Sequence, residues 1–170
     1  SSKHFLISNN IETTKIGIVD FRNILKKSNA MKFLTNKFLS LEKKINQKVK
    51  QKQLFLKSKE QKIIQNKNKL SNIEYKEKIR LFKAEVFQVQ KKYNDERLKL
   101  NKSFQKIQKD IKDLLAQVIK DVSIKKKINV VLLKENVFLF NDLSIDFTKE
   151  VLDLFNDKTK SIKITVISSD

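Results

Sequence analysis

The 170-residue sequence predicts an α+β protein in which a long antiparallel coiled-coil helical hairpin, the arm, projects from a small β-rich body. Three observations support this prediction. Short β-branched segments stand near both ends of the chain, and the polar segment between them has its apolar residues at helical spacing. A capping signal near residue 71 places a reversal between two long helices.

The first part of the body is predicted at residues 15–29. The β-branched run at residues 15–20 is typical of a short buried strand. Asp20 then offers a carboxylate that can cap a following helix, whose inner face holds Phe21, Ile24 and Leu25. The preceding residues 1–14 are expected to form a flexible N-terminal segment.

The first helix of the arm is predicted to have a weak heptad seam. The apolar residues of this seam are Leu34, Phe38, Leu41, Ile45, Val49, Leu56, Ile63 and Leu70. The alternate positions Lys52, Lys59 and Asn66 are polar, so the outer half of the helix buries only one apolar residue per two turns. We therefore expect the arm to be flexible at these three positions.

The hairpin is predicted to reverse at a tip near residues 66–74. Ser71 and Glu74 have the spacing of a capping box, in which the two side chains satisfy free amides at a helix start. A second seam follows, with a stutter near Glu96; its residues are Ile79, Phe82, Val86, Val89, Tyr93, Leu100, Phe104, Ile107, Ile111, Leu114 and Val118. The arm is thus assigned to residues 30–124. Helices of this length extend roughly 60–75 Å, so association through the base is expected to stabilise the protein.

The second part of the body is predicted at residues 125–155. Residues 128–133 and 137–140 read as two strands joined by a turn at 134–136, which together form a β-hairpin. A short amphipathic helix is expected after Asp146. The tail at residues 156–170 alternates at period two over 162–166, which fits either an added edge strand or a disordered segment.

This order of elements resembles the Skp (OmpH-like) periplasmic chaperones over about residues 15–155. The residues that carry the resemblance are Lys15–Asp20, Asn23–Leu25, Ser28, Asn129–Leu133, Asn136–Asn141 and the helix at 146–154. The resemblance implies a homotrimer without a nucleotide cofactor, in which three arms surround a cavity that holds unfolded outer-membrane proteins. It also implies a trimerisation body built from the strands, with the residues Ile16, Ile18, Val130, Leu132, Val137 and Leu139.

The composition excludes several classes of function. The chain has one glycine, no proline and no cysteine, so a glycine-rich phosphate loop, a zinc ribbon or a disulfide framework is excluded. His4 is the only histidine, and the carboxylate pairs have lysine neighbours at helical spacing, which is typical of solvated ion pairs. We therefore expect no catalytic residues, no metal site and no cofactor, and the protein is not predicted to be an enzyme.

The formal net charge of +19 predicts an anionic partner, which could be nucleic acid, a membrane surface or an acidic protein. An abundance of lysine, asparagine, isoleucine and phenylalanine is also typical of chains from AT-rich genomes, but such a bias does not account for the shortage of carboxylates. A basic, DNA-compacting coiled-coil protein is the alternative function. Only three arginines are present and no base-reading module is recognisable, which argues against sequence-specific binding of nucleic acid.

Three apolar residues, Leu54, Phe87 and Leu98, fall opposite the seams of their own helices. Phe87 and Leu98 lie three helical turns apart on one line, flanked by Lys91 and Lys102. Our hypothesis is that these side chains line the inner wall of the arms and touch unfolded clients weakly. The alternatives are packing between neighbouring arms or ordinary surface exposure.

Localisation depends on the resemblance. Within the given sequence no signal-peptide core and no membrane-spanning segment is recognisable. The protein is therefore expected either in the cytosol or, after removal of a signal peptide, in the periplasm, and the resemblance favours the periplasm. An anionic lipid or lipopolysaccharide surface is a further candidate partner there.

Overall fold

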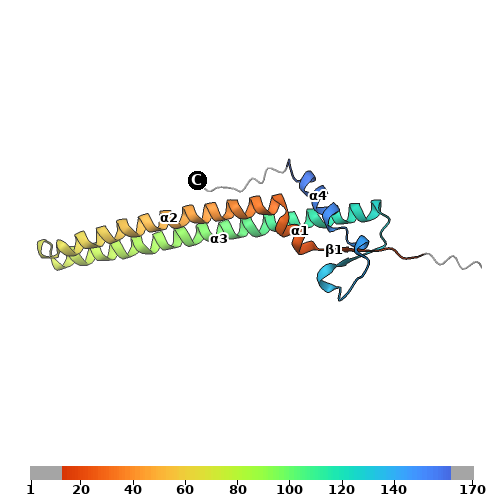
Figure 1. The fold of residues 1–170 in the computed structure, drawn as a ribbon. Helices are drawn as coiled ribbons and strands as arrows, with labels where there is room; N and C mark the ends of the chain where they lie inside the picture. The colour runs from red at the N-terminus through yellow and green to blue at the C-terminus, as the bar shows by residue number, and fades with distance from the viewer. Residues whose placement is uncertain (1–12, 162–170) are drawn as a thin grey trace, which may run out of the picture. The chain divides into compact units, whose positions relative to one another are not determined.

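The computed structural model describes residues 13–161, and these residues form two compact units. Residues 13–29 together with 112–161 form the body, and residues 30–111 form the arm (Figure 1). Two long helices and one small pair of strands dominate the chain, which confirms the predicted fold class. The body includes residues 112–124, which the sequence analysis had assigned to the arm.

The sheet of the body has two strands, β1 (Ile16–Val19) and β2 (Val130–Leu133), which pair in parallel. The pairing begins where the Lys15 amide donates a hydrogen bond to Asn129 Oδ1 at 2.7 Å and Asn129 N donates to the Lys15 carbonyl. On the other side of β1, Phe147 N donates to the Ile18 carbonyl at 3.0 Å. Both ends of the chain therefore build this unit.

The predicted β-hairpin at residues 128–140 is wrong. Residues 134–136 form the 3₁₀ helix η2 (Lys134–Asn136), and no strand follows it at 137–140. A tight hairpin turn needs residues with positive φ, such as Asn-Gly, and Lys134-Glu135-Asn136 does not supply them. The chain consequently leaves the sheet, and the Phe138 side chain is fully exposed.

The core of the body is built from side chains of β1, α1 (Phe21–Lys27), α4 (Thr148–Lys158) and the end of the long helix α3 (Asn72–Lys125), and α1 packs against α4. Asp20 caps α1 as predicted, because its Oδ1 accepts a hydrogen bond from Asn23 N at 3.1 Å. The fully buried apolar side chains of the body are Ile18, Val19, Ile24, Leu115, Val118, Val151 and Phe155.

Helix α4 is longer than predicted, since residues 156–158 of the predicted tail are helical. A short 3₁₀ helix, η3 (Leu143–Ile145), precedes it. The alternating segment at 162–166 and most of the N-terminal segment at 1–14 lie outside the described residues.

The arm consists of α2 (Asn29–Gln65), the 3₁₀ turn η1 (Lys67–Lys69) and the greater part of α3 (Asn72–Lys125), with α2 and α3 side by side (Figure 1). The predicted capping box forms at the reversal, because Glu74 N donates to Ser71 Oγ at 3.1 Å and Ser71 N donates to Glu74 Oε2. The seam also forms: Phe38 and Phe104 pack with ring centroids 4.6 Å apart.

Two residues beyond the end of α3 lies a position where glycine should be better than the native residue. Ile128 N donates to the Ser123 carbonyl at 2.9 Å, and Lys127 lies in the left-handed region with φ 57°. This conformation strains a residue that has a Cβ, so Lys127→Gly is expected to raise the free energy of unfolding by about 1 kcal/mol. Urea unfolding measures the change. The control Lys120→Gly, inside α3, should lower it by about 1 kcal/mol, and a destabilised Lys127→Gly would contradict the prediction.

Candidate functional site

The three apolar side chains predicted to face away from the seam are exposed on the arm. Leu54 and Phe87 are each 62% exposed, and Leu98 is 58% exposed. Lys91 and Lys102 are exposed as well, so cations flank the two apolar groups on α3. Their placement agrees with the helical wheel, and their role in binding stays a prediction.

The arm also exposes apolar side chains that the sequence analysis missed. These residues are Phe33, Leu39, Phe55, Ile64, Ile73 and Leu81. A signal for five of them was available, because Phe33, Leu39, Phe55, Ile64 and Leu81 each stand next to a seam residue in the sequence. Two adjacent apolar residues on a helix point 100° apart, so only one of them can enter a narrow seam.

Three adjoining hollows run along one face of the arm, between α2 and α3. Their volumes are about 380, 350 and 280 Å³. The first two share Gln53, Leu56 and Val86, and the last two share Arg97. We call this continuous depression the arm groove. Its floor is apolar and consists of seam residues, namely Val49, Leu56, Phe82, Val86, Val89, Tyr93 and Leu100.

The polar seam positions have partners in the structure. Lys59 Nζ lies 2.5 Å from Glu85 Oε2, which forms an ion pair across the hairpin. Lys52 Nζ lies 4.8 Å from the centroid of the Phe55 ring. Asn66 is exposed at the tip, where its Nδ2 donates to the Lys62 carbonyl. Sequence reasoning identified these positions as polar but missed Glu85, because the partner depends on the register between the helices.

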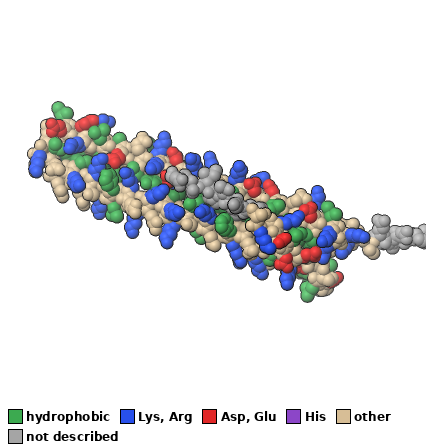
Figure 2. All heavy atoms as spheres, turned by 90° about the horizontal axis from the view of Figure 1, so that it is seen from above, with side chains coloured by type: hydrophobic (Ala, Val, Ile, Leu, Met, Phe, Trp, Pro, Cys, Tyr) green, Lys and Arg blue, Asp and Glu red, His purple; other side chains and the backbone are tan. Residues whose placement is uncertain are grey.

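Positive charge is spread over the surface. Figure 2 shows lysine and arginine side chains distributed along the face in view, with apolar side chains among them and fewer acidic ones. Where these side chains form exposed ion pairs, each pair contributes little to the stability of the fold. The electric field of all the positive charges together is the more important effect, since it attracts anionic partners over several ångströms.

The residues predicted for a trimerisation body differ in their exposure. Ile18 is buried in the core of its own chain. The other strand residues, Ile16, Val130 and Leu132, keep about two fifths of their surface exposed, and Leu139 is largely exposed. Val137 is half-buried. The exposed members therefore leave apolar side chains on the surface of the body.

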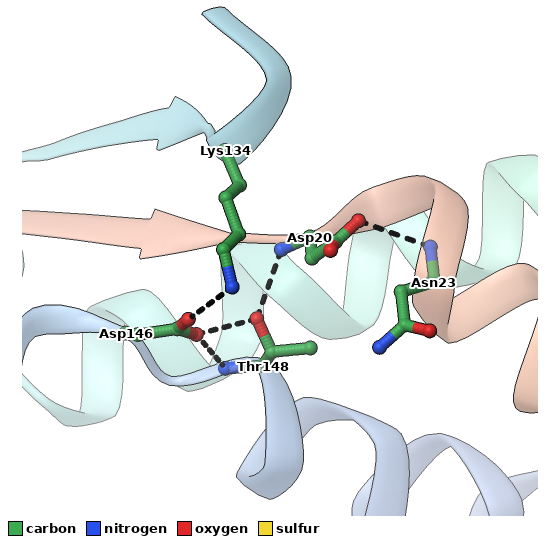
Figure 3. A network of polar contacts seen from close by, with 5 residues as sticks. All are labelled: Asp20, Asn23, Lys134, Asp146 and Thr148. Carbon is green, nitrogen blue, oxygen red and sulfur yellow. Dashed lines mark hydrogen bonds and ion pairs between the residues drawn. The ribbon is translucent and has the colours of Figure 1, made fainter. Parts of the chain in front are cut away.

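A polar network fixes the junction between β1 and α4 (Figure 3). Thr148 Oγ1 accepts a hydrogen bond from Asp20 N at 2.9 Å and donates to Asp146 Oδ1 at 2.5 Å. Asp146 also accepts from Thr148 N, and Lys134 Nζ lies 3.4 Å from its Oδ2. Burial raises the pKa of Asp146, but the hydrogen bonds from Thr148 and the charge of Lys134 together bring this pKa below its ordinary value.

Neither a metal centre nor a membrane span is found in the described part of the chain. Among residues 13–161 no group of three or more histidine, cysteine, aspartate or glutamate side chains could hold a metal ion. No helix in the same residues is both long and apolar enough to cross a membrane. The exposed apolar side chains of the arm and the arm groove make up the candidate site.

Comparison with known proteins agrees with this architecture. The profile of the outer membrane protein (OmpH-like) family matches residues 15–155. A crystal structure from Caulobacter crescentus, described as a candidate outer membrane chaperone (OmpH-like), superposes with a TM-score of 0.80 at 16% sequence identity, and the match covers 94% of each chain. A search of curated proteins finds no significant match. Because the family profile spans both parts of the body and the whole arm, the chain belongs to the OmpH-like family of outer membrane proteins.

Proposed function

We propose that this protein is an ATP-independent periplasmic holding chaperone that captures unfolded outer-membrane proteins in a cavity between helical arms and prevents their aggregation. The observation that carries the proposal is the set of exposed apolar side chains, Leu54, Phe87 and Leu98, on a lysine-rich arm of an OmpH-like chain. Such isolated apolar groups can touch many different segments weakly, which suits a client without a folded surface.

A homotrimer would create the cavity. The structure supports this step through the edge of β2, which pairs with β1 on one side and has no partner strand on the other within residues 13–161. An unpaired strand edge is a template for pairing with another chain. Val130 and Leu132 are exposed at this strand, so association through the body would cover them.

Charge and confinement would act in sequence. The net charge of +19 per chain attracts clients with net negative charge, and an anionic lipid or lipopolysaccharide surface would be attracted in the same way. Once a client lies between the arms, many weak contacts at high effective concentration hold it without nucleotide.

Replacing Leu54, Phe87 and Leu98 together by serine should test the proposal. Loss of these apolar contacts is expected to speed client dissociation about tenfold, which corresponds to about 1.4 kcal/mol. A urea-denatured β-barrel outer-membrane protein is the client, and its release is followed by fluorescence. Helix content and oligomer mass should stay the same, because all three side chains are exposed.

The matched control replaces Gln51, Gln88 and Gln105, which are exposed on the same helices, by serine. This control should release the client at the wild-type rate. Equal release from all three proteins would refute the role of the three apolar residues. Displacement of the client by equimolar duplex DNA would instead favour the basic nucleic-acid-associated alternative.

The polar seam positions are proposed to keep the arm compliant, so that it adapts to clients of different size. Replacing Lys52, Lys59 and Asn66 by leucine would complete the apolar seam. The variant is expected to unfold at a higher urea concentration and to hold a narrower size range of denatured barrel proteins. A stiffer arm with an unchanged client range would contradict the proposed role of compliance.

A further inference from the structure

The arm groove differs from an ordinary coiled-coil surface in that its floor is accessible apolar surface. Leu56 is nearly buried, while Val49, Val86, Val89 and Tyr93 each keep part of their surface open. The hollows of about 380, 350 and 280 Å³ lie in one row and are open to solvent, so side chains of a bound segment can reach them from outside.

The rim of the groove consists largely of amide side chains. Gln53 lies on the α2 bank, and Gln90 and Asn94 lie on the α3 bank. Each primary amide has two donors and one acceptor oxygen, which is the combination that an extended polypeptide backbone requires. Apolar pockets with amide rims therefore suit a peptide better than they suit a lipid chain, which has no backbone to satisfy.

The charge of the rim indicates which charged side chains a bound peptide would carry. Lys57, Lys83 and Arg97 line the groove, against Glu60 and Glu42. The excess is positive, so acidic side chains on the occupant are favoured over basic ones.

The three exposed apolar residues lie outside the groove, one helical turn from residues of its rim. On a helix, residues three or four apart are neighbours. Phe87 is therefore next to the rim residues Lys83 and Gln90, and Leu98 is next to Asn94. Leu54 is next to Lys57 on the opposite bank. The other face of the arm is bridged by the Lys59–Glu85 ion pair, so the two faces are not equivalent.

From these contacts we infer that the arm groove binds one extended client segment in which apolar residues alternate with polar or acidic ones. Alternate side chains of such a segment enter the hollows, and the backbone between them bonds to the amide rim. The inference rests on the proposed function, because it names where on the arm and in what conformation a client lies.

The test fills the groove. In the variant Gln53→Trp/Gln90→Trp two indole rings occupy the space above Leu56 and Val86. The matched control Gln51→Trp/Gln88→Trp places the same rings two residues away, one turn from Phe55 and Glu85 on the bridged face. The probe is a fluorescein-labelled ten-residue peptide that alternates valine with serine and aspartate, and its binding is measured by anisotropy. The groove variant should bind at least about tenfold more weakly, and the control should stay within about twofold of wild type. Equal affinity of the two variants would overturn the inference.

A second measurement does not depend on filling the groove. The chain has no cysteine, so Gln90→Cys and Gln88→Cys each introduce a single thiol. Saturating peptide should slow the reaction of iodoacetamide with the first thiol at least about fivefold and leave the second unchanged. Equal protection of both thiols, or of neither, would overturn the inference.

Failure of the groove inference can be distinguished from failure of the proposed holding function. If the wild-type protein fails to suppress aggregation of the denatured barrel protein, the holding function is wrong, whatever the peptide does. If wild type and the groove variant both suppress aggregation and bind the peptide equally, the holding function stands and the groove assignment is wrong.

Discussion

Gly17→Val is expected to lower the free energy of unfolding by about 3 kcal/mol, which corresponds to a fall of roughly 6–12 °C in the thermal midpoint. A Cβ at residue 17 would lie 2.7 Å from Phe147 Cε1 and 2.9 Å from Ile128 Cδ1. Phe147 is buried, so its ring has little room to withdraw. The extra methyl groups of valine would push β1 away from this ring and break the junction with α4.

Two controls separate this clash from a general effect on the strand. Ile16→Val removes one methylene from a partly exposed neighbour and should change the free energy of unfolding by less than about 1 kcal/mol. In the double variant Gly17→Ala/Phe147→Leu, the smaller leucine at residue 147 should restore part of the free energy of unfolding that Gly17→Ala alone removes. Strictly additive losses would show that the two residues do not interact.

Asp146→Ala should lower the free energy of unfolding by about 2–3 kcal/mol, because it removes the acceptor for two hydrogen bonds from Thr148 and an ion-pair partner of Lys134. Asp142→Ala is the matched control. Asp142 accepts the same pair of hydrogen bonds from Ser144, but in an exposed turn, and its loss should cost less than about 1 kcal/mol. Equal losses from the two variants would contradict the structural role assigned to Asp146.

The same carboxylate makes the stability of the body depend on pH. Because the folded state lowers the pKa of Asp146 below its ordinary value of 3.8, the carboxylate stabilises the fold fully above that value. The stabilisation is lost as the pH falls through the folded pKa. The difference in stability between wild type and Asp146→Asn, measured by urea unfolding, should therefore be constant near neutral pH and shrink below about pH 4. A difference that stays constant down to pH 2.5 would refute this linkage.

Local signals were sufficient to predict the elements whose partners are near in sequence. The cap of α1 by Asp20 and the pairing of Ser71 with Glu74 could be predicted because each interaction joins residues only three positions apart. The two seams were recognisable for the same reason, since each apolar residue has its next neighbour one or two turns away. The segment at 137–140 has the composition of a strand. Whether it forms a strand depends on whether the preceding turn can bring it back beside β2, and the composition of the segment does not determine this.

The candidate site was predictable only in part. The exposure of Leu54, Phe87 and Leu98 follows from angles within one helix. The arm groove depends on which residues of α2 stand opposite which residues of α3, and this register is a property of the pair. The Lys59–Glu85 ion pair was missed on the same ground.

The body is assembled from both ends of the chain, and this has a consequence for the order of folding. Lys15 and Asn129 are 114 residues apart, so β1 and β2 cannot pair until nearly the whole chain is available. Closing so long a loop directly is entropically unfavourable, whereas the arm forms through contacts that grow outward from its tip. We therefore expect the helical hairpin to form first. Its formation brings residues 29 and 112 close together, which shortens the loop that remains to be closed, and the strands then pair. A folding chain would therefore expose the apolar side chains of the arm before the strand edge of the body exists.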